Sequence, residues 1–221
     1  MTGKRSYADW RQSWPDVIVR TQTDTAVDYL QRYYAVGVDD EPQYTGARFE
    51  AMAALNTDPN TLGPEDFLAV SMLSVNVPAE SAIRLLGRDA ATIGRLLSQI
   101  PTGVDIIDIA PEMLGGDSPA GQLWGVLRRD RDGLGPTRTS KLLAAKRPRL
   151  LPIWDSFVEQ ATGLNTVDYW RKFQYVLADD QRLVWDWLGE LRSLTPNLPS
   201  TIPQLRILDV LLWMSVHVGS R

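Results

Sequence analysis

Two glycines that flank one leucine form the pattern with the most chemical content in this sequence. Gly133-Leu134-Gly135 is followed by Pro136, and helical patterns lie on both sides of it. Glycine adopts the positive φ of a tight turn and lets another backbone approach closely, and proline suits the first position of a helix. Backbone amides at such a helix start attract anions. The pattern therefore predicts a helical hairpin that holds a phosphate, although a plain turn between two helices has the same sequence.

A carboxylate stands at a defined distance beyond this hairpin. Asp155 follows Gly135 by twenty residues, comes directly after Trp154 and precedes a short helical segment. Asp is a preferred N-cap, which contributes about 1 kcal/mol to its helix. A purely structural cap need not face a cleft, whereas a catalytic carboxylate must face one beside the hairpin. Trp154, which adjoins Asp155, is a candidate aromatic wall of such a pocket.

Together these features resemble the helix-hairpin-helix DNA glycosylase superfamily, whose hairpin is followed at this spacing by a Pro-Val-Asp segment. Pro152-Ile-Trp-Asp155 stands at the matching place, and Phe67–Asn76 is similar to the family's buried helix that ends in Leu-Ser-x-Gln. The resemblance covers about residues 65–163. It implies that the chain binds DNA, that Asp155 acts on the sugar of a flipped nucleotide, and that Asn76 fills the gap left by the base.

Departures from the family pattern narrow the implied activity. Bifunctional members place a lysine two residues after the second hairpin glycine, where this chain has Thr137, and Lys141 lies one helical turn further along. The resemblance thus implies monofunctional hydrolysis of an N-glycosidic bond without lyase activity, or a fold that binds DNA without catalysis. The stretch from Ser140 to Asp155 (SKLLAAKRPRLLPIWD) is also similar to uncharacterised bacterial proteins that carry a domain of unknown function.

The basic residues are concentrated around the hairpin. Residues 128–149 contain eight basic and two acidic side chains, a net charge of +6, which leaves −10 on the other 199 residues. A basic segment on an acidic body can hold a phosphate backbone locally, although such a run is also typical of a solvated helix face. The candidate DNA-binding residues are Gly133, Leu134, Gly135, Thr137, Arg138, Lys141, Lys146, Arg147 and Arg149.

The residue types that are missing exclude several classes of chemistry. The 221-residue chain has no cysteine, which excludes disulfides, thiolate zinc sites, a cysteine nucleophile and iron–sulfur clusters. Its single histidine, His217, argues against a multi-histidine metal centre and a Ser-His-Asp triad. We therefore expect no metal and no cofactor. The polar start lacks the apolar core of a signal peptide, and no run of eighteen apolar residues could span a membrane, so we expect a cytoplasmic protein without membrane contact.

Helical periodicity dominates the chain, and no segment alternates long enough to predict a strand. We expect about nine or ten helices in an all-α, glycosylase-like bundle, formed as one unit over residues 1–221 or as two abutting lobes. Residues 1–61 would supply an N-terminal helix and loop, 65–163 the core and 164–221 the C-terminal helices. The segment 64–75 is too apolar for a surface helix and predicts the buried central one. The expected helices are 24–34, 64–75, 78–86, 89–100, 118–129, 137–146, 156–163, 166–177, 180–194 and 203–217.

Three functions remain open from the sequence. The first is a DNA glycosylase with Asp155 as its carboxylate, the second a non-catalytic nucleic-acid-binding module, and the third a scaffold for a protein partner. The early segment Tyr44–Glu50 is a further candidate to reach the cleft. Most of the eight tryptophans lie at amphipathic helix positions, which predicts that they pack in the core.

Overall fold

The computed structural model describes residues 11–219, apart from the side chains of Asp130 and Asp180, and the regular structure of this part of the chain is helical. It contains eleven α-helices and three 3-10 segments, and its extended pairs are limited to isolated bridges such as Arg129 with Leu134. The expected all-α class is confirmed. The number of helices is higher than the nine or ten expected, because short helices also form in the N-terminal part of the chain.

The helices follow one another with short connections. The first half of the chain forms α2 (Asp16–Val19), α3 (Thr23–Tyr33), α4 (Phe49–Ala53), α5 (Pro64–Met72), α6 (Ala79–Leu86) and α7 (Ala90–Leu97). The second half forms α8 (Pro119–Leu127), α9 (Pro136–Lys146), α10 (Ser156–Thr162), α11 (Tyr169–Leu194) and α12 (Gln204–Gly219). The 3-10 segments are Thr45–Arg48, Pro111–Leu114 and Asp130–Asp132.

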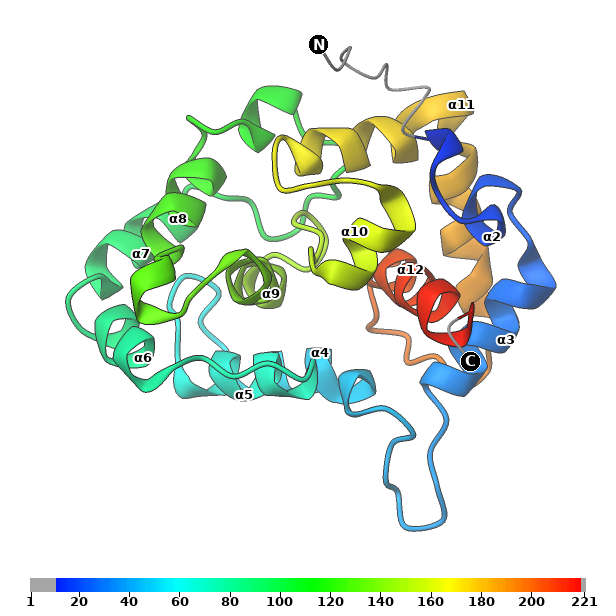
Figure 1. Ribbon diagram of the computed structural model, residues 1–221, viewed down its shortest axis with the longest axis horizontal. Coiled ribbons are helices and arrows are strands. Elements are labelled where there is room, and N and C mark those ends of the chain that lie inside the picture. The colour runs from blue at the N-terminus through cyan, green and yellow to red at the C-terminus, as the bar shows by residue number, and fades with distance from the viewer. Residues whose placement is uncertain (1–10, 220–221) are drawn as a thin grey trace.

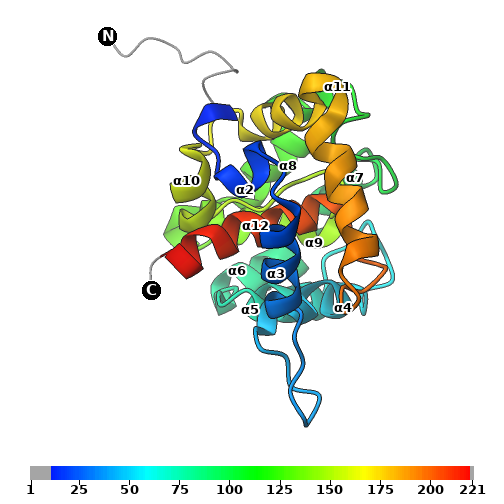
Figure 2. The same ribbon diagram turned by 90° about the vertical axis from the view of Figure 1, so that its right-hand side faces the viewer.

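Helices from the two ends of the chain pack on each other. In Figure 1, α2, α3 and α12 gather on one side, and α6, α7 and α8 form the opposite side. Contacts of α12 with α2 and α3, and of α11 with α3, join the N-terminal helices to the C-terminal ones, and α10 also packs along α12. Figure 2 shows α12 crossing behind α3. One main apolar cluster runs from Trp14 to Met214 and includes residues of both sides, so they share a core.

The central buried helix is α12, and the expectation that segment 64–75 takes this place is wrong. Every residue from Leu205 to Leu212 is buried, and α12 lies between α10 and α3 (Figure 1). In α5, by contrast, Leu68 is 45% exposed, and the helix lies with α4 along an outer edge. The apolar residues of α5 are distributed around the helix, and only part of that surface meets a neighbour.

The two helices expected at 166–177 and 180–194 form one element with a break. Gln181 and Arg182 have the positive φ values 55° and 70° inside α11. Left-handed residues interrupt the helical direction, and α11 correspondingly turns a corner in Figure 1. The sequence thus predicted two helical arms correctly but not their continuity.

Candidate active site

The hairpin forms where the glycines and proline predict it. Gly133 has φ +79°, and Gly135 is the N-cap of α9, with Pro136 in the first turn. The turn is closed by Arg129 and Leu134, whose backbone N–H groups each donate to the other's carbonyl oxygen, at 3.1 and 3.2 Å. The Leu134 side chain is fully buried in the main core cluster. Helices α8 and α9 are therefore joined by a tight turn, which its own backbone hydrogen bonds and the buried Leu134 side chain stabilise.

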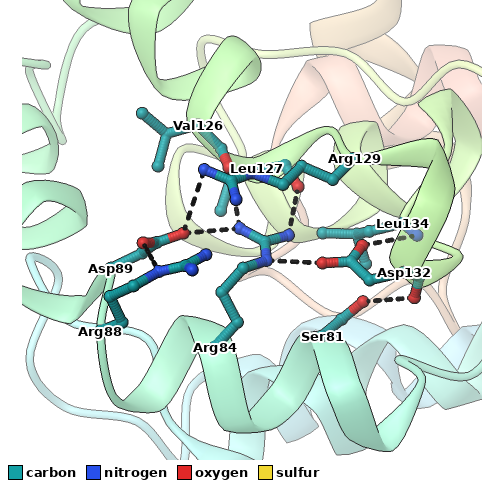
Figure 3. Close-up of polar contacts among 9 residues, drawn as sticks. All are labelled: Ser81, Arg84, Arg88, Asp89, Val126, Leu127, Arg129, Asp132 and Leu134. Atoms are coloured by element: carbon teal, nitrogen blue, oxygen red, sulfur yellow. Dashed lines mark hydrogen bonds and ion pairs between the residues drawn. The ribbon is translucent and has the colours of Figure 1, made fainter.

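The buried Arg84 on the neighbouring helix α6 binds this hairpin through several hydrogen bonds (Figure 3). Its Nε donates to Asp132 at 2.6 Å and its Nη1 to Asp89 at 2.8 Å. Its guanidinium also donates to the carbonyl oxygens of Val126 and Leu127 at the end of α8, both at 2.9 Å. The network explains why Asp132 precedes the hairpin here, since its carboxylate is the acceptor that ties the turn to α6.

The start of α9 keeps backbone donors available. Arg138 Nε donates to the Asn76 carbonyl oxygen at 2.7 Å and Nη1 to that of Gly133 at 2.8 Å, which places a guanidinium against the turn. Within the described residues, the amides of Gly133, Gly135 and Thr137 donate to no acceptor. Free amides at the positive end of a helix dipole beside an arginine suit an anion.

Asp155 is both an N-cap and the partner of a lysine. Its Oδ1 accepts hydrogen bonds from the amides of Phe157 and Val158, at 3.0 and 3.1 Å, and so begins α10. Its Oδ2 lies 3.2 Å from Lys141 Nζ, and the side chain is 13% exposed. Ser140, the residue before Lys141 on α9, bonds to the backbone of Trp154. The second hairpin helix therefore positions the carboxylate directly.

The Asp155 carboxylate lines a pocket of about 600 Å³. Thr137 and Lys141 of α9 line the same pocket, so the second hairpin helix and the carboxylate meet at one site, while the turn residues Gly133–Gly135 are not part of the lining. Aromatic rings form much of the wall: Trp213 stacks on His217 with a centroid distance of 4.3 Å, and Tyr44 meets Trp213 edge-on at 5.2 Å. The five aromatic rings of the lining are Tyr33, Tyr44, Phe157, Trp213 and His217.

A buried charged group on α12 forms the back of the pocket. Arg206 Nε lies 2.8 Å from Glu50 Oε1, and Arg206 also pairs with Asp209. Burial raises the pKa of Glu50 and of Asp209, and the neighbouring Arg206 guanidinium opposes this without cancelling it. The negative charge of Asp155 raises the pKa of Asp209 further. The pocket therefore holds two carboxyl groups, Asp155 and Asp209, in different environments.

Part of the basic segment faces inward: Lys141, Lys146 and Arg147 are buried, whereas Arg128, Arg131 and Arg149 are exposed. Lys146 is buried, 3.3 Å from Asp66, and donates to the Asp58 carbonyl oxygen. Arg147 is fully buried. Arg149 forms two hydrogen bonds to Asp105, at 2.9 and 2.7 Å. Lys146 and Arg147 therefore differ from the predicted phosphate contacts, because both are buried: Lys146 pairs with Asp66, and Arg147 bonds to neutral acceptors inside the fold.

Two other predicted residues lie outside the pocket lining. Asn76 is exposed, and its backbone carbonyl meets Arg138, while the neighbouring segment Met72–Val75 lines the pocket instead. The Trp154 indole donates to the Leu164 carbonyl oxygen at 2.8 Å and packs against the main core. Tyr44 reaches the pocket as expected for its segment, whereas Arg48 pairs with Asp40 away from it.

Sequence reasoning missed Arg206, Asp209, Trp213 and His217. One signal was present: Arg206 and Asp209 interrupt the apolar run of α12, and charged residues are almost never fully buried unless they are paired. The aromatic wall carried no such signal, since a tryptophan at helical spacing also fits a core. In the part of the chain that the structure describes, no three His, Asp or Glu side chains converge as metal ligands. None of the described helices is both long and apolar enough to cross a bilayer.

Fold and site together define an all-helical protein in which a glycine hairpin borders a pocket with aromatic walls and a capping carboxylate. Residues 26–216 match a family of unknown function (DUF6308), and the chain belongs to this family. No curated protein and no solved structure matches the chain. The expected likeness to a family of unknown function is confirmed at this level.

Proposed function

We propose that the protein binds nucleic acid at the hairpin and hydrolyses the N-glycosidic bond of a nucleotide whose base enters the pocket, with Asp155 as the essential carboxylate. The observation that carries this proposal is the shared pocket: Asp155 lines it together with Thr137 and Lys141 of the hairpin helix and five aromatic rings. Its volume of about 600 Å³ lies within the range of roughly 300–1,000 Å³ common for small-molecule sites.

The chemistry of the pocket walls suits a nucleobase. Planar bases stack on aromatic side chains with little dependence on their identity, and enzymes that act on a base extrude it from the helix into such a pocket. Tyr44, Trp213 and His217 offer ring faces and edges, and the buried Nε2 of His217 has no partner among the described residues. A base that enters here finds stacking surfaces and an unused polar atom.

The position of Asp155 supports a role in the bond-breaking step. As a C1′–N bond breaks, positive charge develops on the sugar, and a fixed carboxylate stabilises that charge without reorganisation. Two backbone amides and Lys141 hold the carboxylate in one orientation. Thr137 stands where a Schiff-base lysine would be needed, which favours hydrolysis over lyase chemistry.

Phosphate binding would use the backbone more than the basic side chains. Once the buried Lys146 and Arg147 are excluded, the free amides of Gly135 and Thr137 and the Arg138 guanidinium remain at the start of α9, and Arg149 remains exposed beside Asp105. We therefore expect few ionic contacts, and a modest decrease of log affinity with log salt concentration.

The direct test is base excision. Duplex and single-stranded oligonucleotides with a panel of modified and mismatched bases are incubated with the protein, and abasic sites are revealed by alkaline cleavage. We expect excision of at least one base, and a decrease of about 10²-fold or more for Asp155→Asn. Asn is as good an N-cap as Asp, so this variant keeps the start of α10. Asp108→Asn, at an exposed carboxylate paired with Arg182, is the matched control. Full activity of Asp155→Asn, or no excision of any base, overturns the catalytic proposal.

The second candidate is a nucleic-acid-binding module without catalysis. It is favoured by the fact that both oxygens of Asp155 already have partners, as in a purely structural cap. Fluorescence anisotropy with labelled oligonucleotides would show salt-dependent binding that Arg138→Glu weakens, without abasic sites. If no nucleic acid binds at any salt concentration, both candidates fail, and a protein partner becomes the remaining hypothesis.

A further inference from the structure

The pocket contains a second carboxyl group that sequence reasoning did not connect with Asp155. Asp209 lies in the middle of the buried stretch of α12, is 9% exposed and lines the same pocket. A charged side chain at such a position is expensive for the fold unless its contacts or its function require it. This location gives Asp209 access to whatever the pocket binds.

The contacts of Asp209 leave one oxygen available. Its Oδ2 faces the Arg206 guanidinium, whereas its Oδ1 has no hydrogen-bond partner among the described residues. Arg206 is shared, since its Nε lies 2.8 Å from Glu50 and its Nη2 donates to the Tyr33 hydroxyl at 2.9 Å and to the Gly46 carbonyl. One guanidinium thus serves two carboxyl groups, so their negative charge is not fully neutralised.

The charged surroundings favour a proton on Asp209. Burial raises its pKa, Arg206 on the same helix opposes this, and the negative charge of Asp155 raises the pKa again. The other ionisable groups that face this region are Glu50 on α4, Tyr33 on α3 and Lys141 on α9. Asp155, by contrast, faces three donors: two backbone amides and the Lys141 ammonium group. Two carboxyl groups whose surroundings differ in this way are suited to separate acid and base roles.

We propose that Asp209 is the general acid of this site and that the substrate is an uncharged nucleobase, which needs a proton to leave. The inference rests on the proposed hydrolysis. As the C1′–N bond breaks, its electron pair passes to the base nitrogen, and that nitrogen takes the proton of Asp209. Water adds to C1′ and passes a proton to the Asp155 carboxylate. Exchange with solvent then removes this proton from Asp155 and returns one to Asp209, so the enzyme is restored and the products are the free base and an abasic sugar.

The experiment compares leaving groups that do and do not need protonation. Single-turnover excision is measured on DNA with an uncharged base found active in the panel and on DNA with 7-methylguanine, which departs as a neutral molecule without an added proton. Asp209→Asn should slow excision of the uncharged base by about 10²- to 10⁴-fold and change the 7-methylguanine rate by less than about threefold. Asp155→Asn should slow both. Circular dichroism of the Asn variants checks that they are folded.

A measurement on the wild-type protein tests the same claim if Asp209→Asn does not fold. The excision rate for the uncharged base should fall as the pH rises through the pKa of Asp209, because only the protonated acid can donate a proton to the base. The excision rate for 7-methylguanine should not fall in this pH range. Equal pH profiles for the two bases, equal slowing of both by Asp209→Asn, or wild-type excision of 7-methylguanine alone would overturn the role of Asp209. If the wild-type protein excises neither base nor any other, the proposed function itself fails.

Discussion

Arg147 offers a strong test of the buried part of the basic segment. Its side chain is fully buried, has no carboxylate partner among the described residues, and donates five hydrogen bonds. Burial lowers its pKa to about 10, so it remains charged at neutral pH. The acceptors are the carbonyl oxygens of Pro59, Leu97, Ile100 and Lys146 and the side-chain oxygen of Asn60. One guanidinium therefore ties the loop before α5 and the end of α7 to the end of α9.

Arg147→Met keeps much of the aliphatic volume and removes every donor. Four of the five acceptors belong to distant segments, and a buried acceptor left without a partner costs about 1–3 kcal/mol. At about 1 kcal/mol for each of the four acceptors, the free energy of unfolding should fall by about 4 kcal/mol. This is a large part of the ~5–15 kcal/mol that is typical of a domain. In urea unfolding followed by circular dichroism, this corresponds to a midpoint lower by about 2 M for an m-value of ~2 kcal/mol/M.

Arg149→Met is the matched control two residues away. Arg149 is 48% exposed and bonds only to Asp105, so its removal should lower the free energy of unfolding by ~1 kcal/mol or less. If Arg147→Met is as stable as wild type, or if the two variants lose the same amount, the argument is wrong. Arg147 would then face solvent and again be a candidate for phosphate contact, visible as weaker DNA binding by a fully stable variant.

Two further predictions concern the hairpin. Burial raises the pKa of Asp132, but hydrogen bonds from Arg84 and Ser81 outweigh this effect, so the pKa is lowered in the folded protein. The ionised carboxylate therefore stabilises the fold at a pH above its unfolded pKa, and this stabilisation is lost as the pH falls through the pKa of the folded state. Asp132→Asn should therefore lower the free energy of unfolding by about 2 kcal/mol at pH 7, and the difference from wild type should shrink on acidification in urea titrations; a constant difference would contradict the ion pair. Gly133→Ala should lower it by about 1–2 kcal/mol in thermal unfolding, because the residue has φ +79° and a Cβ would meet Pro78 at 3.0 Å, whereas Gly125→Ala, in open space on α8, should lose nothing.

Features that depend on nearby residues were predictable from the sequence. The hairpin turn, the proline at the start of α9 and the capping role of Asp155 each depend on residues within a few positions, and the structure places them as expected. The burial of α5 was not predictable in this way, because the number of apolar residues in a helix does not determine how much of its surface a neighbour covers. The break in α11 was not predictable either. The helical periodicity of each arm is visible in the sequence, but it does not show that the two arms continue into each other.

The roles of the basic residues depend on partners far away in the chain. Lys146 meets Asp66, eighty residues earlier, and Arg147 bonds to carbonyl oxygens 47–88 residues away. Composition alone describes a +6 segment, whereas the fold uses part of that charge to stabilise buried groups. A run of basic residues without local acidic partners therefore does not establish a binding surface. Backbone carbonyl oxygens and carboxylates far away in the sequence can accept the hydrogen bonds of these residues within the fold.

The pocket unites residues from the ends and the middle of the chain, and this arrangement makes its two carboxyl groups chemically different. Asp155 begins a helix and meets a lysine of the hairpin, which supplies three donors to its carboxylate. Asp209 lies inside an apolar helix and shares one arginine with Glu50. Because the hairpin fixes the first group and the terminal helices fix the second, their separation depends on how α10 packs along α12. The aromatic wall is shared in the same way, since Tyr44 and Trp213 come from the terminal parts of the chain and Phe157 comes from α10 next to Asp155.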